Sequence, residues 1–169
     1  KAIEKKNPTT ENRLVMGPWI HGGWGGRGDG SYLGNVRFGS KTAEYYQKNI
    51  EIPFFNFYLK LKGTVRDIAE ASIFFTGENE WKNLKTWPPA GMELKNLYTH
   101  ANGGLSFENK TSSGNSFSEY VSDPAHPVPY TEDVHMGRTR EYMTDDQRFA
   151  SRRPDVLSFS TGVLTDDLT

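Results

Sequence analysis

Residues 14–23 read LVMGPWIHGG, and this stretch decides the fold. The apolar run at 14–16 is typical of a short buried strand in a parallel sheet, where both faces of the strand are covered. The Gly-Pro dipeptide that follows ends the strand, since it favours a turn and proline has no backbone N–H to donate. The strand therefore leads directly into a loop that carries His21.

The loop after His21 is rich in glycine, with six glycines between residues 22 and 30. Glycine makes a backbone permissive at an entropic cost, and it is usually kept where the chain must approach something closely. Such loops often belong to functional sites, and His21 stands at the start of this one. Trp19, Trp24 and Tyr32 are candidate substrate-binding residues around it: they either line a pocket or fill the gap between two domains.

The segment from residue 42 to about residue 61 is predicted to be the one long helix of the chain. Its apolar positions recur at steps of three and four residues, as expected for one buried helix face: Ala43, Tyr46, Ile50, Phe54, Phe57 and Leu61. Pro53 lies within this segment and removes one backbone hydrogen bond, so we expect a kink or a break there. Lys60, Lys62 and Gly63 favour a helix end.

Beyond Gly63 the pattern changes to short strand-like runs separated by turns. The runs lie at residues 71–76, 94–98, 104–107, 117–121 and 156–160. Such a series is typical of a β-sandwich or a jelly roll. The sequence therefore predicts a mainly β chain with an N-terminal α/β part.

Composition excludes several classes of partner and chemistry. With 20 Lys and Arg against 21 Asp and Glu, no net field would attract nucleic acid or an anionic membrane surface, and we expect neither partner. Without cysteine, the chain has no disulfide, thiolate nucleophile or cysteine-bound zinc. His100, His126 and His135 lack metal-ligand spacing, so we predict no metal and no cofactor.

Five ordered blocks of sequence resemble one hydrolase family. They read LVMGPWIHG at 14–22, PFFNFYLK at 53–60, FTGENEW at 75–81 with WPP at 87–89, DPAHPVP at 123–129, and DQRFASRRPDVLSFST at 146–161. This pattern resembles the C-terminal half of the α-amino-acid ester hydrolases and their relatives. Those relatives are the glutaryl cephalosporin acylase-like and cocaine esterase-like proteins and the X-Pro dipeptidyl peptidases.

The resemblance implies a fold and a role for His21. It implies that residues 1–65 are the last strand and helix of an α/β-hydrolase domain and that residues 66–169 begin a jelly-roll domain. It also implies that His21 is the base of a serine triad, which takes the proton of the serine hydroxyl and returns it to the leaving group. The substrate would be a small acyl ester or amide, and the parent protein an exported or periplasmic bacterial one.

The nucleophile and its orienting acid are expected outside this chain. In such hydrolases the chain order is serine, acid, histidine. No Gly-x-Ser-x-Gly elbow occurs anywhere in the 169 residues. We therefore expect this chain alone to be inactive.

An alternative of another class remains open, namely a non-catalytic jelly-roll module that binds carbohydrate or a partner protein. Trp81 and Trp87 would stack on a sugar if exposed, or pack the first β-hairpin if buried. Either way, an incomplete sandwich would leave strand edges and an apolar face uncovered. We therefore expect a homo-oligomer.

Overall fold

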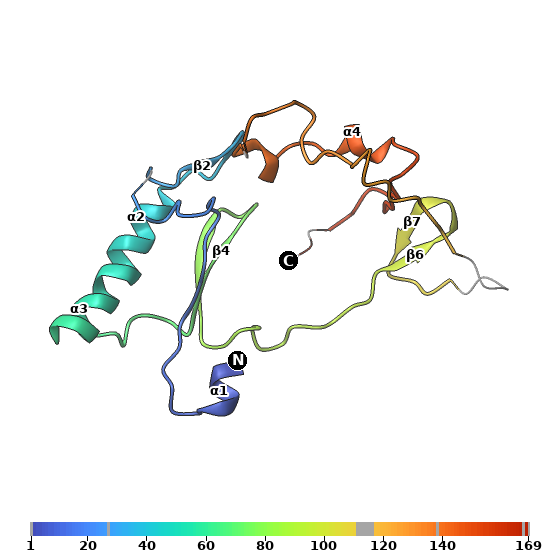
Figure 1. Cartoon of the computed structure of the whole chain (residues 1–169). Helices are drawn as coiled ribbons and strands as arrows, with labels where there is room; N and C mark the ends of the chain where they lie inside the picture. Colours follow the sequence, from blue (N-terminus) through green and yellow to red (C-terminus); the bar gives the residue numbers. More distant parts are fainter. Residues whose placement is uncertain (1, 27, 111–116, 138, 167, 169) are drawn as a thin grey trace. The chain divides into compact units, whose positions relative to one another are not determined.

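The computed structural model describes residues 2–26, 28–110, 117–137, 139–166 and 168. The chain divides into two compact units, Lys1–Met92 and Glu93–Thr169, and each is described by itself (Figure 1). The elements of the first unit are α1 (Ala2–Lys6), β1 (Leu14–Met16), β2 (Tyr32–Leu33), β3 (Val36–Arg37), α2 (Thr42–Tyr46), the π-helical turn η1 (Gln47–Glu51), α3 (Ile52–Lys60), β4 (Ala71–Phe75) and β5 (Glu80–Leu84).

The predicted strand at 14–16 is β1, and it lies in a three-stranded sheet of order β1-β4-β5. β1 pairs with β4 in parallel, and β4 pairs with β5 in an antiparallel hairpin. The four residues at 71–74 of the central strand are buried. The expectation that β1 is covered on both faces is wrong for this structure, because Met16 is 51% exposed while Leu14 and Val15 are partly buried.

The predicted helix forms from residue 42 to residue 60, and in place of a kink or break at Pro53 it contains a π-helical turn just before that residue. This turn is η1, between α2 and α3. Pro53 is the second residue of α3, which directly follows η1, so its missing N–H falls where the helical hydrogen-bond pattern changes. Figure 1 shows α2, η1 and α3 as one continuous coil.

The core of the first unit lies where this coil packs on residues 65–68 and β1. Ile50, Val65 and Ile68 are buried at its centre. Partly buried apolar side chains pack against them: Val15, Tyr45, Tyr46, Phe54 and Phe57. Helix packing and the position of β1 are therefore coupled through one apolar cluster.

The second unit contains β6 (Tyr98–His100), the 3-10 turn η2 (Ala101–Gly103), β7 (Gly104–Ser106), the 3-10 turn η3 (Glu141–Met143) and α4 (Arg148–Ser151). β6 and β7 form an antiparallel hairpin, and Ser160 adds a single bridge beside Gly104. The predicted strands at 94–98 and 156–160 are reduced to these remnants.

The prediction of a strand at 117–121 is wrong. These residues form no strand, and Phe117 and Val121 are 84% and 77% exposed. An apolar run needs a partner strand and a covering layer to become a buried strand, and the described part of the chain offers it neither. The described residues thus form small sheets with few helices rather than a closed sandwich.

The domain boundary predicted between residues 65 and 66 stays a prediction. The structure groups β4 and β5 with β1, on the N-terminal side of Met92. Among the described residues, none of the helices has the length and apolar character needed to cross a bilayer.

Candidate active site around His21

His21 lies in the turn that follows β1, and its side chain is exposed. Its ring meets the Trp24 ring edge-on, with the two centroids 6.1 Å apart. No side chain or backbone group within the described residues forms a hydrogen bond with the imidazole.

Trp19 folds back over the Gly17 backbone, and only glycine allows this. A Cβ built on Gly17 would lie 2.4–2.5 Å from three atoms of the Trp19 ring, which is a severe overlap. The backbone N–H of Trp19 also donates to the Gly17 carbonyl at 3.0 Å. The Gly-Pro-Trp sequence thus forms a tight turn that presents His21 two residues later.

A buried threonine anchors the Trp19 side chain. The indole N–H of Trp19 donates to the Thr42 hydroxyl at 2.8 Å. The Thr42 hydroxyl in turn donates to the Gly30 carbonyl at 2.6 Å. Because Thr42 is the first residue of α2 and is fully buried, this chain of hydrogen bonds joins the start of the His21 loop, the end of the glycine-rich loop and the helix.

The end of the glycine-rich loop also caps α2. The Asp29 carbonyl accepts the N–H groups of Ala43 and Glu44 at 2.9 and 3.4 Å, two donors that a helix cannot satisfy by itself. The Asp29 carboxylate accepts the backbone N–H of Ser31. Hydrogen bonds from Ser31, followed by the attraction of Lys41, hold the Asp29 pKa below its ordinary value of 3.8.

A second anchor lies after His21. The side-chain amide of Gln47, the first residue of η1, donates to the Trp24 carbonyl at 2.7 Å. The segment from 19 to 24 is therefore fastened to one helix at both of its ends. Within it, the Gly23 N–H donates to the Ile20 carbonyl at 2.9 Å and closes the turn that holds His21.

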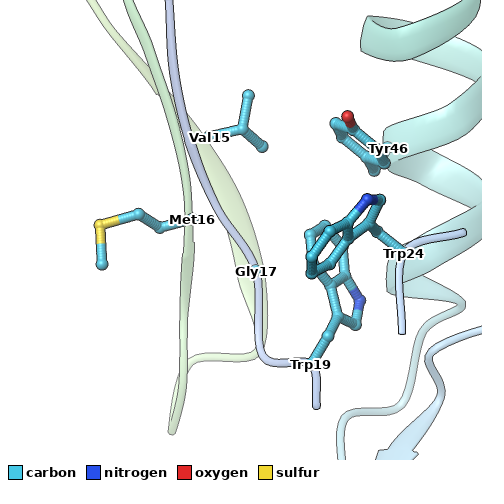
Figure 2. A pocket seen from close by; sticks show the side chains of 6 residues that line it. All are labelled: Val15, Met16, Gly17, Trp19, Trp24 and Tyr46. Atoms are coloured by element: carbon cyan, nitrogen blue, oxygen red, sulfur yellow. The ribbon is translucent and has the colours of Figure 1, made fainter. Parts of the chain in front are cut away.

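An apolar cavity of about 320 Å³ lies beside this turn. Figure 2 shows Val15, Trp19, Trp24 and Tyr46 on one side of the strand, with Met16 directed to the other. The residues that line the cavity are Val15, Met16, Gly17, Trp19, Trp24 and Tyr46. Burial, with the Glu51 carboxylate adding to it, raises the pKa of Tyr46, so this hydroxyl stays neutral near pH 7.

The structure brings two of the three predicted binding residues together. Trp19 and Trp24 both line the cavity, with ring centroids 6.3 Å apart. Tyr32 lies in β2, half-exposed, where the Arg37 guanidinium covers its ring at 4.7 Å. It is not among the described residues that line the cavity.

Sequence reasoning missed Thr42 and Gln47. The signal for Thr42 was present, since threonine at the start of a periodic helix is a typical capping residue. Its actual partners are an indole 23 residues earlier and a carbonyl 12 residues earlier, and periodicity cannot reveal such contacts.

The other candidate residues lie elsewhere. Trp81 of β5 stacks on Tyr45 with centroids 5.1 Å apart and also contacts Trp19 and Phe74. His126 forms a 2.8 Å contact with Asp123 in an exposed turn of the second unit. The described residues contain no group of three His, Cys, Asp or Glu positioned to hold a metal ion.

Comparison with known proteins shows that the chain is similar to hydrolases. The chain is 28% identical over 164 residues to the cocaine esterase of Rhodococcus sp. (strain MB1 Bresler), covering 91% of this chain and 28% of that protein. No family model matches the chain.

Two solved structures are similar over nearly the whole chain. An α-amino acid ester hydrolase matches with a TM-score of 0.79 and 40% identity; the match covers 98% of this chain and 28% of the hydrolase chain. An aminopeptidase from a marine sediment archaeon, Thaumarchaeota archaeon, matches with a TM-score of 0.78 and 35% identity; the match covers 95% of this chain and 26% of the aminopeptidase chain. The chain thus spans just over a quarter of the length of these proteins. The resemblance that the sequence predicts is confirmed: this chain is a relative, in sequence and in structure, of hydrolases of the cocaine esterase and α-amino-acid ester hydrolase group.

Proposed function

We propose that this chain is part of a serine hydrolase that cleaves acyl ester or amide bonds through an acyl-enzyme, and that His21 is its general base and acid. The observation that carries the proposal is the His21 imidazole, exposed in the turn after a parallel strand and without a hydrogen-bond partner among the described residues. The similarity to an esterase, an ester hydrolase and an aminopeptidase supports it.

The chemistry assigns His21 two proton transfers. As base, the neutral imidazole accepts the serine proton while the serine oxygen attacks the acyl carbon; as acid, it gives that proton to the leaving alkoxide or amine. Its second ring nitrogen would donate to a carboxylate that orients the ring. We assign the serine to residues outside this chain, since its 169 residues contain no Gly-x-Ser-x-Gly elbow, and the carboxylate likewise, since the acid lies between the serine and the histidine in the chain order of such hydrolases.

For the substrate we propose a small acyl compound from the classes that the resemblance implies: α-amino-acid esters, β-lactam side chains or X-Pro peptides. The uncharged cavity lined by Trp19 and Trp24 supports an apolar group on the acyl or leaving side. The reaction as proposed uses no cofactor. We also propose that residues 66–169 contribute to a jelly-roll domain of the longer protein, as the sequence pattern predicts.

The test compares two exposed histidines in the longer protein that contains this chain. His21→Ala should lower kcat on a nitrophenyl aminoacyl ester by about 10³-fold or more, because the serine loses its base. His126→Ala is the matched control and should leave kcat unchanged, since the His126 ring lies exposed in a turn of the second unit, where it contacts Asp123. Activity that survives His21→Ala would disprove the proposal. Hydrolysis by the 169-residue chain alone, abolished by His21→Ala, would show that the site is complete without further residues.

The packing of Trp81 argues against the alternative of a carbohydrate-binding module. Its ring stacks on Tyr45 and is not an exposed platform, and Trp87 is also partly buried. A sugar-binding surface needs aromatic faces open to solvent. Binding of oligosaccharides that is lost on Trp87→Ala would reverse this preference.

A further inference from the structure

The strongest unassigned feature near His21 is the buried hydroxyl of Thr42. It accepts the Trp19 indole N–H and donates to the Gly30 carbonyl, so both its donor and its acceptor function are used. Its side chain is fully buried. A residue that is buried, fully hydrogen-bonded and in contact with both loops that flank the site is suited to hold them in register.

We propose that Thr42 is a positioning residue for His21, acting through the Trp19 indole; this inference rests on the proposed function of His21. The imidazole itself has no hydrogen bond within the described residues, so its position is set by the backbone that carries it. That backbone is fixed two residues before His21 by Trp19 and three residues after it by the Trp24 carbonyl.

Of these two anchors, the Thr42 link is the one shielded from water. The bond from Gln47 to Trp24 lies at the exposed surface, where water competes for both partners. The bond from Trp19 to Thr42 ends on a fully buried hydroxyl, and hydrogen bonds gain strength where water is excluded. The geometry thus assigns the larger share of loop positioning to Thr42.

The backbone of Gly30 lies so close to Thr42 that no side chain fits at this position. A Cβ on Gly30 would lie 2.5 Å from the Thr42 hydroxyl oxygen and 2.5 Å from the Ala43 nitrogen. The backbone of Gly30 also has a positive φ of 74°, which glycine adopts without strain. The absent side chain at Gly30 therefore lets the carbonyl reach the hydroxyl that also holds Trp19.

The experiment removes the hydroxyl and keeps the shape of the side chain. In the longer protein, Thr42→Val should lower kcat by about 10- to 100-fold, since small misplacements of a catalytic group cost this much, with a smaller change in KM because Trp19 also lines the cavity proposed for the substrate. Thr42→Ser keeps a hydroxyl and should restore kcat. Thr131→Val is the matched control: Thr131 is another buried threonine that donates to a backbone carbonyl, that of Asp133, and its loss should leave kcat unchanged.

Three outcomes would overturn the inference. They are an unchanged kcat in folded Thr42→Val, an equal fall in kcat in Thr131→Val, and a failure of Thr42→Ser to restore activity. If Thr42→Val does not fold, Trp19→Phe decides. It removes the indole donor together with part of the ring and leaves the bond from Thr42 to Gly30 in place, so an unchanged kcat in Trp19→Phe would count equally against the inference.

A readout without catalysis separates this inference from the proposed function. In the 169-residue chain, hydrogen exchange of the Trp19 indole N–H, followed by NMR, should be slow in the parent and in Thr42→Ser and at least tenfold faster in Thr42→Val. The His21 ring resonances should shift in Thr42→Val and stay in place in Thr131→Val. If these results hold while His21→Ala keeps full activity, the proposed function fails and the structural link stands.

Discussion

At the scale of single residues, Gly30 and Gly39 allow the cost of a left-handed backbone to be measured apart from the cost of steric overlap. Gly30 and Gly39 have similar positive φ angles, 74° and 69°. A Cβ at Gly39 would meet nothing within 4 Å, whereas one at Gly30 would overlap Thr42 and Ala43. The two positions therefore form a matched pair for substitution by alanine.

Gly39→Ala should lower the free energy of unfolding by about 1–2 kcal/mol, the cost of a left-handed alanine. Gly30→Ala should lower it by more than about 3 kcal/mol, because overlap with the start of α2 adds to the strain. Urea denaturation monitored by tryptophan fluorescence measures both. Equal losses in the two variants would mean that the loop moves away from α2 at little cost.

The lowered pKa of Asp29 predicts that the stability of the fold depends on pH. Its pKa in the folded chain lies below 3.8, chiefly through hydrogen bonds from Ser31. A depressed carboxylate pKa stabilises the fold above the unfolded pKa, and this contribution is lost as pH falls through the folded pKa. The urea midpoint of the parent should therefore exceed that of Asp29→Asn near neutral pH, and the difference should shrink as pH falls below about 4. A difference that stays constant down to pH 2 would contradict the assignment.

At the scale of elements, the helix from residue 42 to residue 60 was the most predictable part of the chain. Its apolar positions follow helical spacing, and that local pattern persists through η1 because a π-turn inserts an extra residue without ending the helix. Pro53 indicated where the irregularity falls, since its effect depends only on the missing N–H and the ring.

Two isoleucines test which face of this helix is buried. Ile50 is 6% exposed in the core cluster, and Ile52, the first residue of α3, is 53% exposed. Ile50→Ala should cost about 2–5 kcal/mol of unfolding free energy, from lost burial and the cavity left behind. Ile52→Ala should change it by no more than about 0.5 kcal/mol, as surface substitutions usually do. Thermal and urea unfolding of the two variants measure this contrast. A larger loss in Ile52→Ala than in Ile50→Ala would contradict the assignment of the buried face.

The strands of the second unit were the least predictable elements. The apolar composition at 117–121 is suited to a strand, yet these residues lie exposed and unpaired in the described structure. Strand formation depends on a partner that local sequence cannot supply. The hairpin of β6 and β7 forms without a distant partner because a short turn at 101–103 joins its two strands.

At the scale of the whole molecule, the isolated chain exposes apolar surface that favours association. Ile52, Phe55 and Leu59 lie on one face of α3 and are all at least half exposed. In the second unit, Ala150 and Thr131 are the described residues classed as buried. Such surfaces tend to pair with another chain.

We therefore predict that the 169-residue chain forms homo-oligomers at high concentration. Phe55→Gln combined with Leu59→Lys should shift it toward the monomer, because charge and polarity on the α3 face oppose burial. Sedimentation velocity over a concentration series measures this. Lys85→Gln at an exposed position is a control that should not change the association. A monomer at all concentrations would show that the α3 face does not mediate self-association.

From local sequence alone we could predict the strand before the Gly-Pro turn, the helix from residue 42 and the family resemblance. These follow from local rules, namely apolar spacing and the backbone limits of glycine and proline. Only the tertiary structure decided that Trp19 is anchored on Thr42, that Asp29 caps α2, and that β1 is an edge strand beside β4. Each of these joins residues from 14 to 57 positions apart, and such pairings depend on how the elements pack rather than on local preference.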